Sequence, residues 1–97
     1  MQKVKFQGWN CNVLFNKYHE GKGYRIDLID ADDGTPVAVA TLNVPDIELE
    51  SDEVIIKDYS ENKGMHDALI KYGIIKHTNK FVKLSQFITA PIAKIIH

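Results

Sequence analysis

Five acidic residues in the middle of the chain are the side chains best placed to do chemistry. They occupy alternate or adjacent positions, and they are Asp46, Glu48, Glu50, Asp52 and Glu53. Alternate side chains of an extended chain share a face and lie about 7 Å apart, a spacing comparable to that of phosphates along a nucleic-acid strand. The pattern therefore predicts a negative surface that docks on a basic macromolecule through these five residues. The same charges could instead only protect an exposed sheet edge from pairing with another chain.

The charge of the chain is unevenly distributed, although its formal net value is only −1. Ten of the thirteen acids lie between Asp27 and Asp58, where Lys57 is the single base. Such charge blocks influence association more than fold. An alternative hypothesis is a small nucleic-acid-binding module, in which C-terminal lysines meet phosphates and neighbouring aromatic rings stack on bases. Its residues would be Lys71, Lys76, Lys80 and Lys83, with Tyr72 and Phe81 between them. The adjacent acids would repel phosphate, so the sequence favours a protein partner.

Metal-binding patterns fail when their spacing is checked. The run from Asp30 to Gly34 resembles the start of a calcium loop. The sixth and twelfth positions, however, are Thr35 and Thr41 instead of the required glycine and glutamate. No two histidines have a helical or short-turn metal spacing; they are His19, His66, His77 and His97. We therefore expect no metal and no cofactor.

Catalytic patterns are equally weak, and we expect no catalytic residues. Cys11 alternates with Val13 and Phe15, as a core residue of a strand does. The glycine-rich segment 21–23 lacks the rest of a phosphate-loop motif. A small-molecule binder is a further alternative, and it would need a pocket with converging polar groups. A single cysteine, an N-terminus without an apolar block and the lack of any run of about 20 apolar residues favour the cytoplasm.

Hydrophobic periodicity predicts a single α+β domain over residues 1–97. Alternation indicates strands over residues 11–18, 24–28, 37–42, 53–57, 81–84 and 92–96, and an extended segment with one negative face over 46–50. Turns are expected at 20–23, 32–35 and 78–80, the first two from their glycines. A helix is expected over 61–72, with Ser60 as N-cap and Gly73 as the residue that ends it.

The expected architecture is an antiparallel sheet of about five or six strands packed against this one helix. Its core should contain one side chain or more from each main element. The core residues expected are Val13, Phe15, Ile26, Leu28, Val39, Ile55, Met65, Leu69, Tyr72 and Phe81. Trp9 is interpreted as a cap on one end of this core.

Three segments of the chain resemble a family of small bacterial and phage proteins that is catalogued as a domain of unknown function. The segments are 30–41 (DADDGTPVAVAT), 56–75 around IKDYSENKGM, and 87–91. The resemblance spans roughly residues 9 to 96 and implies an origin on a phage or another mobile element. It implies no activity and no site residues. Together with the acidic segment it favours a non-enzymatic accessory protein that binds a macromolecular partner, such as an inhibitor of a host defence or nucleic-acid enzyme.

Overall fold

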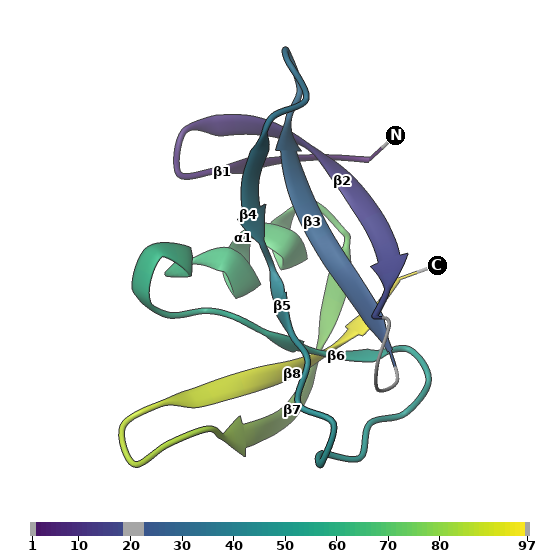
Figure 1. Cartoon of the computed structure of the whole chain (residues 1–97), viewed down its shortest axis with the longest axis vertical. Helices are drawn as coiled ribbons and strands as arrows, with labels where there is room; N and C mark the ends of the chain where they lie inside the picture. Colours follow the sequence, from purple (N-terminus) through teal and green to yellow (C-terminus); the bar gives the residue numbers. More distant parts are fainter. Residues whose placement is uncertain (1, 19–22, 97) are drawn as a thin grey trace.

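Two four-stranded antiparallel sheets form the body of the protein in the computed structural model, which describes residues 2–18 and 23–96 (Figure 1). The first sheet contains, in spatial order, β1 (Lys3–Phe6), β2 (Trp9–Lys17), β3 (Tyr24–Asp30) and β4 (Pro36–Val39). The second contains β5 (Thr41–Leu42), β6 (Glu53–Ile56), β8 (Thr89–Ile95) and β7 (Ile75–Lys83). The α+β class is confirmed, but the expectation of one sheet with five or six strands is wrong.

One residue, Ala40, carries the chain from the first sheet to the second. Its N–H donates to the Ile26 carbonyl of β3 at 2.8 Å, and its own carbonyl accepts from Lys57 N–H at 2.8 Å, just past the end of β6. The run 37–42 was expected to be one strand, and it is instead shared between two sheets. The side chain of Ala40 is fully buried at this corner. A strand that changes sheet at a bend is the usual way to turn a corner between two packed sheets.

The expected helix is shorter than residues 61–72: among the described residues, α1 (Met65–Lys71) is the one α-helix, and it follows a 3₁₀ turn over Ser60–Asn62. Ser60 is not the N-cap as expected, because Gly64 takes that place with a positive φ of 93°. Gly73 ends the helix as expected: its N–H donates to Ile70 and the next N–H, of Ile74, donates to Leu69. Its left-handed φ of 74° suits glycine. Within the described residues, no helix has the length and apolar content needed to cross a membrane.

The second sheet is covered on both faces at β6, and this explains why all four residues of that strand are buried. One face, with Val54 and Ile56, joins the main core, which also includes the inner face of the first sheet and the helix. The opposite face, with Ile55, forms a smaller cluster under the segment that connects β5 to β6. The connecting segment therefore belongs to the packed structure, although it forms no strand.

Three aromatic residues expected in the core are exposed instead. Phe81 is 65% exposed, Tyr72 40% and Phe15 38%. Tyr72 lies just past the end of α1, and Phe15 and Phe81 each lie two residues before the end of their strand. Val39 is half-buried and Trp9 is 52% exposed, so Trp9 does not cap the core. The other six expected core residues are buried.

The strand boundaries differ from the expectation in two further places. β1 was not expected, and it pairs along β2 from Lys3 opposite Asn12 to Phe6 opposite Trp9. The expected turn at 78–80 is a bulge inside the continuous strand β7, where Asn79 has a φ of 60°. Most of the turn expected at 20–23 lies outside the described residues.

Candidate functional site

The segment 43–52, called here the acidic loop, presents its charges to solvent because its apolar residues point inward. Ile47 and Leu49 pack against the smaller core cluster on the second sheet. The residues between and beside them, Asp46, Glu48 and Glu50, are exposed. The alternation of exposed and half-buried residues is present, but the segment is not extended throughout as expected, because residues 44–47 form a turn in which Ile47 N–H donates to the Val44 carbonyl at 3.0 Å. Apolar contacts anchor the loop and leave its three carboxylates exposed.

Glu53 does not belong to this exposed surface, since its residue is only 2% exposed. One carboxylate oxygen forms an ion pair with Lys80 of β7, and the other accepts a hydrogen bond of 3.0 Å from the backbone N–H of Glu50. Burial acts to raise the pKa of Glu53, but the hydrogen bonds from Lys80 and Glu50 N–H outweigh it and hold the pKa below its usual value. Glu53 is thus a buried anion that fixes the end of the acidic loop.

Asp52 and Glu50 are partly neutralised by a lysine of β8. Lys94 Nζ lies 3.7 Å from Glu50 Oε2 and 4.0 Å from Asp52 Oδ1. These distances describe loose ion pairs, and the Glu50 side chain stays 67% exposed. Asp46 and Glu48 have no ion pair with any described residue. Of the five carboxylates predicted as partner contacts, the structure exposes Asp46, Glu48 and Glu50, leaves Asp52 half-buried and buries Glu53.

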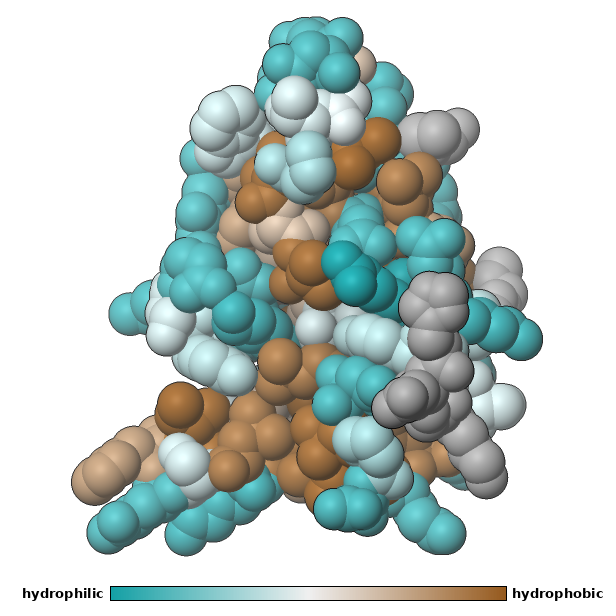
Figure 2. Space-filling view, viewed as in Figure 1, coloured by the Kyte–Doolittle hydropathy of each residue, from teal (hydrophilic) through white to brown (hydrophobic). Residues whose placement is uncertain are grey.

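Two hollows border the acidic loop. One, of about 360 Å³, lies among loop residues and is lined by Leu42, Asn43, Val44, Pro45, Ile47, Glu48 and Leu49. The other, of about 520 Å³, lies between the loop and the facing ends of β2 and β3, and its described lining is Lys17, Tyr18, Gly23, Tyr24, Leu49, Glu50 and Ser51. Figure 2 shows apolar residues gathered over the lower half of the visible face, where β5 and the loop cross the second sheet. The acids therefore lie beside apolar recesses.

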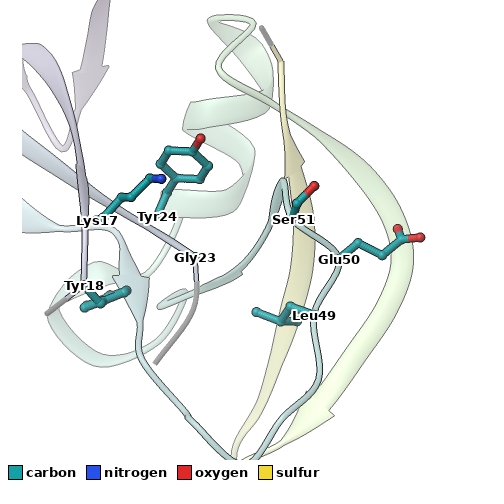
Figure 3. A pocket seen from close by; sticks show the side chains of 7 residues that line it. All are labelled: Lys17, Tyr18, Gly23, Tyr24, Leu49, Glu50 and Ser51. Atoms are coloured by element: carbon teal, nitrogen blue, oxygen red, sulfur yellow. The ribbon is translucent and has the colours of Figure 1, made fainter. Parts of the chain in front are cut away.

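The larger hollow has a mixed lining, in which two tyrosines and Leu49 lie beside charged and polar residues. In Figure 3 the Leu49 side chain points toward Tyr18, while the Glu50 carboxylate points away from the hollow. The Tyr18 hydroxyl is 2.7 Å from Thr41 Oγ1, and burial raises the pKa of Tyr18 despite that hydrogen bond. Lys17 Nζ lies 5.8 Å from the centre of the Tyr24 ring, a cation–π distance. The volume is within the range of small-molecule sites, so a small-molecule binder stays a prediction.

Two of the C-terminal candidates lie together, since Lys71 Nζ is 5.7 Å from the centre of the Tyr72 ring at the end of α1, but the lysines of β7 are divided between the two faces of the second sheet. Strand register places Lys76 opposite Lys94 and Lys80 opposite Ile92 on one face of the second sheet. Phe81 and Lys83 lie opposite Pro91 and Thr89 on the other face. Lys80 is also occupied by Glu53. Nucleic-acid binding through these lysines stays a prediction, and the geometry gives it no continuous groove.

The fold brings together two histidines that the sequence spacing did not connect. The rings of His66, in α1, and His77, in β7, are 5.0 Å apart and meet edge to face. His66 is 8% exposed, and its Nε2 is buried without a hydrogen-bond partner. Burial and then the neighbouring His77 lower the pKa of His66, against smaller opposing effects of Asp58 and Asp67. Only the tertiary structure could show this contact.

The described residues contain no arrangement that would hold a metal ion and no accessible, reactive thiol. No group of three or more histidine, cysteine, aspartate or glutamate side chains is arranged to hold a metal ion within 2–18 and 23–96. The acids of the rejected calcium loop bind their own turn, for example Asp33 Oδ1 to Thr35 N–H at 3.0 Å. Cys11 is 1% exposed, and burial, followed by the charge of Asp30, raises the pKa of its thiol. A buried thiol with a raised pKa is a poor nucleophile.

Comparisons of the chain with protein-family models, with curated proteins and with solved structures find no match.

Proposed function

We propose that the protein is a non-enzymatic accessory protein that docks on a basic macromolecular partner through its acidic loop. The single observation that carries the proposal is the in-and-out alternation of the loop, which fixes Ile47 and Leu49 on the core and leaves Asp46, Glu48 and Glu50 outside. Because the loop is already packed, binding would cost little backbone ordering. The exposed carboxylates would steer a cationic partner toward this side of the molecule.

The recesses beside the acids support docking of a protein more than simple counterion attraction. Protein interfaces combine an apolar centre with a charged rim, and the acidic loop has this arrangement in miniature. The resemblance to proteins of phages and mobile elements directs the search for the partner to a host defence enzyme or nucleic-acid enzyme. Such enzymes carry basic clefts for phosphates, and the exposed carboxylates of Asp46, Glu48 and Glu50 have the charge that such a cleft attracts.

A direct test uses a defined cationic probe, an arginine-rich decapeptide, titrated into the ¹⁵N-labelled protein. We expect amide shifts concentrated in residues 43–52, and an affinity that falls as salt rises. The variant D46K/E48K should bind at least tenfold more weakly. A matched control, D32K/D67K, reverses two exposed acids that lie outside the loop and should bind as the wild type does, apart from the shared change in net charge.

Two results would contradict the proposal. One is a set of shifts spread evenly over the acids of residues 27–33 and of the loop. The other is an equal loss of affinity in both double variants, because net charge alone would then explain binding. Each surface substitution changes stability by about 0.5 kcal/mol or less, and 1 kcal/mol shifts the melting temperature of a domain of this size by about 4–8 °C, so both double variants should unfold within about 8 °C of the wild type.

A further inference from the structure

The outer edge of β7 after its bulge is an open strand edge with backbone groups directed away from the sheet. β7 is an edge strand of the second sheet, and within the sheet it pairs with β8. Before the bulge, His77 packs against His66 of the helix. After it, the exposed residues Lys80, Phe81 and Lys83 follow one another along the edge, separated only by the buried Val82. The four residues from Lys80 to Lys83 therefore form a short, accessible edge.

The alternation of hydrogen-bonded pairs between β7 and β8 shows which residues of β7 direct their backbone N–H and C=O groups away from β8. Leu84 N–H donates to the Ile88 carbonyl at 2.8 Å, so this facing pair is a hydrogen-bonded one. Hydrogen-bonded and non-hydrogen-bonded pairs alternate along an antiparallel ladder. The N–H and C=O groups of Phe81 and Lys83 therefore point away from β8. The residue opposite Phe81 is Pro91, which has no N–H to offer, in agreement with this phase.

The side chains of the same two residues define the chemistry of a partner. Phe81 is 65% exposed, and Lys83 is exposed on the same face of the sheet. Within the described residues Lys83 has no ion pair, whereas Lys80 is held by Glu53. A strand added here would meet an apolar ring and a cation at alternate positions, and each contact would recognise one side chain of the added strand.

The charges also decide between a foreign strand and a second copy. A pair of β7 edges from two copies would bring the unpaired Lys83 side chains of both copies onto the joined sheets with no acid between them, and like charges close together on a sheet are destabilising. Edge lysines are a common protection against such self-pairing. The protection does not apply to an acidic strand, for which the same lysines are attractive.

We propose that the β7 edge from Lys80 to Lys83 binds an extended acidic segment of another protein by strand addition. The backbone groups of Phe81 and Lys83 pair with the segment, an apolar side chain of the segment covers Phe81, and a carboxylate pairs with Lys83. This surface is separate from the acidic loop. Figure 1 shows the β7–β8 hairpin projecting to the side opposite the β5–β6 connection, which contains the loop.

The test uses the eight-residue capped peptide Val-Thr-Glu-Thr-Val-Thr-Glu-Thr, in which valine and glutamate take turns on one face of the extended chain, and a control peptide with lysine in place of glutamate. Amide hydrogen exchange is measured by NMR with and without each peptide. We expect the acidic peptide to protect the amides of Phe81 and Lys83 at least tenfold, and the lysine peptide to leave them unprotected. Protection of these outward amides is the specific sign of strand addition, because docking through side chains alone would not produce it.

Three variants complete the test. F81S and K83Q should each weaken the affinity for the acidic peptide about three- to tenfold. F87S is the matched control, since Phe87 is 89% exposed in the β7–β8 turn and lies off the edge, so its affinity should be unchanged. Three results would each overturn the proposal. They are no protection of Phe81 and Lys83, equal binding of both peptides, and protection that grows with protein concentration alone, which would identify a second copy as the occupant.

Discussion

Removing Lys80 should destabilise the protein more than removing Glu53, although the two residues form one ion pair. Glu53 is 2% exposed, while the Lys80 side chain is 50% exposed. In K80M, Glu53 keeps its buried charge and loses its main cation. Breaking a fully buried pair from one side costs about 3–5 kcal/mol. Lys80 is half in water and the hydrogen bond from Glu50 N–H remains, so we expect a loss of about 2–3 kcal/mol.

The reverse substitution, E53Q, leaves Lys80 free to be hydrated. The glutamine oxygen can still accept a hydrogen bond from Glu50 N–H, but this bond is weaker without the negative charge. The expected loss in the free energy of unfolding is therefore about 1 kcal/mol. The double variant K80M/E53Q should be more stable than K80M, because the unpaired buried carboxylate is gone. Urea unfolding at pH 7 measures all three changes in the free energy of unfolding.

Lowering the pH should distinguish the two single variants further. The pKa of Glu53 is lowered in the folded protein, so its contribution to stability is present above the unfolded pKa of about 4.3 and is lost as the pH falls through the folded value. In K80M this contribution is diminished. The difference in the free energy of unfolding between K80M and E53Q should therefore become smaller in acid, where Glu53 is protonated and carries no buried charge. The reasoning is wrong if E53Q is the more damaging change at pH 7, or if the double variant shows the sum of the two single losses.

Three further predictions concern the elements around the acidic loop and the helix. His66 is buried with a lowered pKa, so wild-type stability should fall as the pH drops below the unfolded histidine pKa of about 6.5; H66Q should show a smaller fall in urea midpoint between pH 7.5 and 5.5. G64A should cost about 1–2 kcal/mol in urea unfolding from its φ of 93° alone, because no atom lies within 4 Å of an added Cβ, whereas K63A should be nearly neutral. L49A should lower the free energy of unfolding by about 1–2 kcal/mol and increase amide exchange across residues 43–52, because Leu49 anchors the loop.

Local patterns in the sequence predicted the features that depend on near neighbours. Gly73 ends the helix because hydrogen bonds to the last helical carbonyls require a residue with left-handed backbone angles. Glycine adopts these angles most easily, so its position in the sequence predicted the end of the helix. The alternation of acidic and aliphatic residues predicted the exposure of Asp46, Glu48 and Glu50 correctly, although the turn over residues 44–47 was not expected. Alternation along β2 likewise predicted the burial of Cys11.

Features that depend on distant residues could not be predicted in this way. The two sheets separate at Ala40, whose backbone binds Ile26 on one side and Lys57 on the other, and nothing within the run 37–42 marks this division. Glu53 has the same residue type as Glu50, and its burial depends on Lys80, which lies far along the chain. Phe81 looks like a core residue in the sequence, but its exposure depends on which elements pack over its face of the second sheet.

The central claim is that the acidic loop is the docking surface, and the most direct measurement is a comparison of partner affinity by calorimetry. The partner is a basic protein recovered on the immobilised wild-type chain, and it is titrated against wild type, D46K/E48K and D32K/D67K at one salt concentration. Our account predicts at least tenfold weaker binding, about 1.4 kcal/mol or more, for D46K/E48K alone. Unchanged affinity of D46K/E48K, or an equal loss in D32K/D67K, would contradict it.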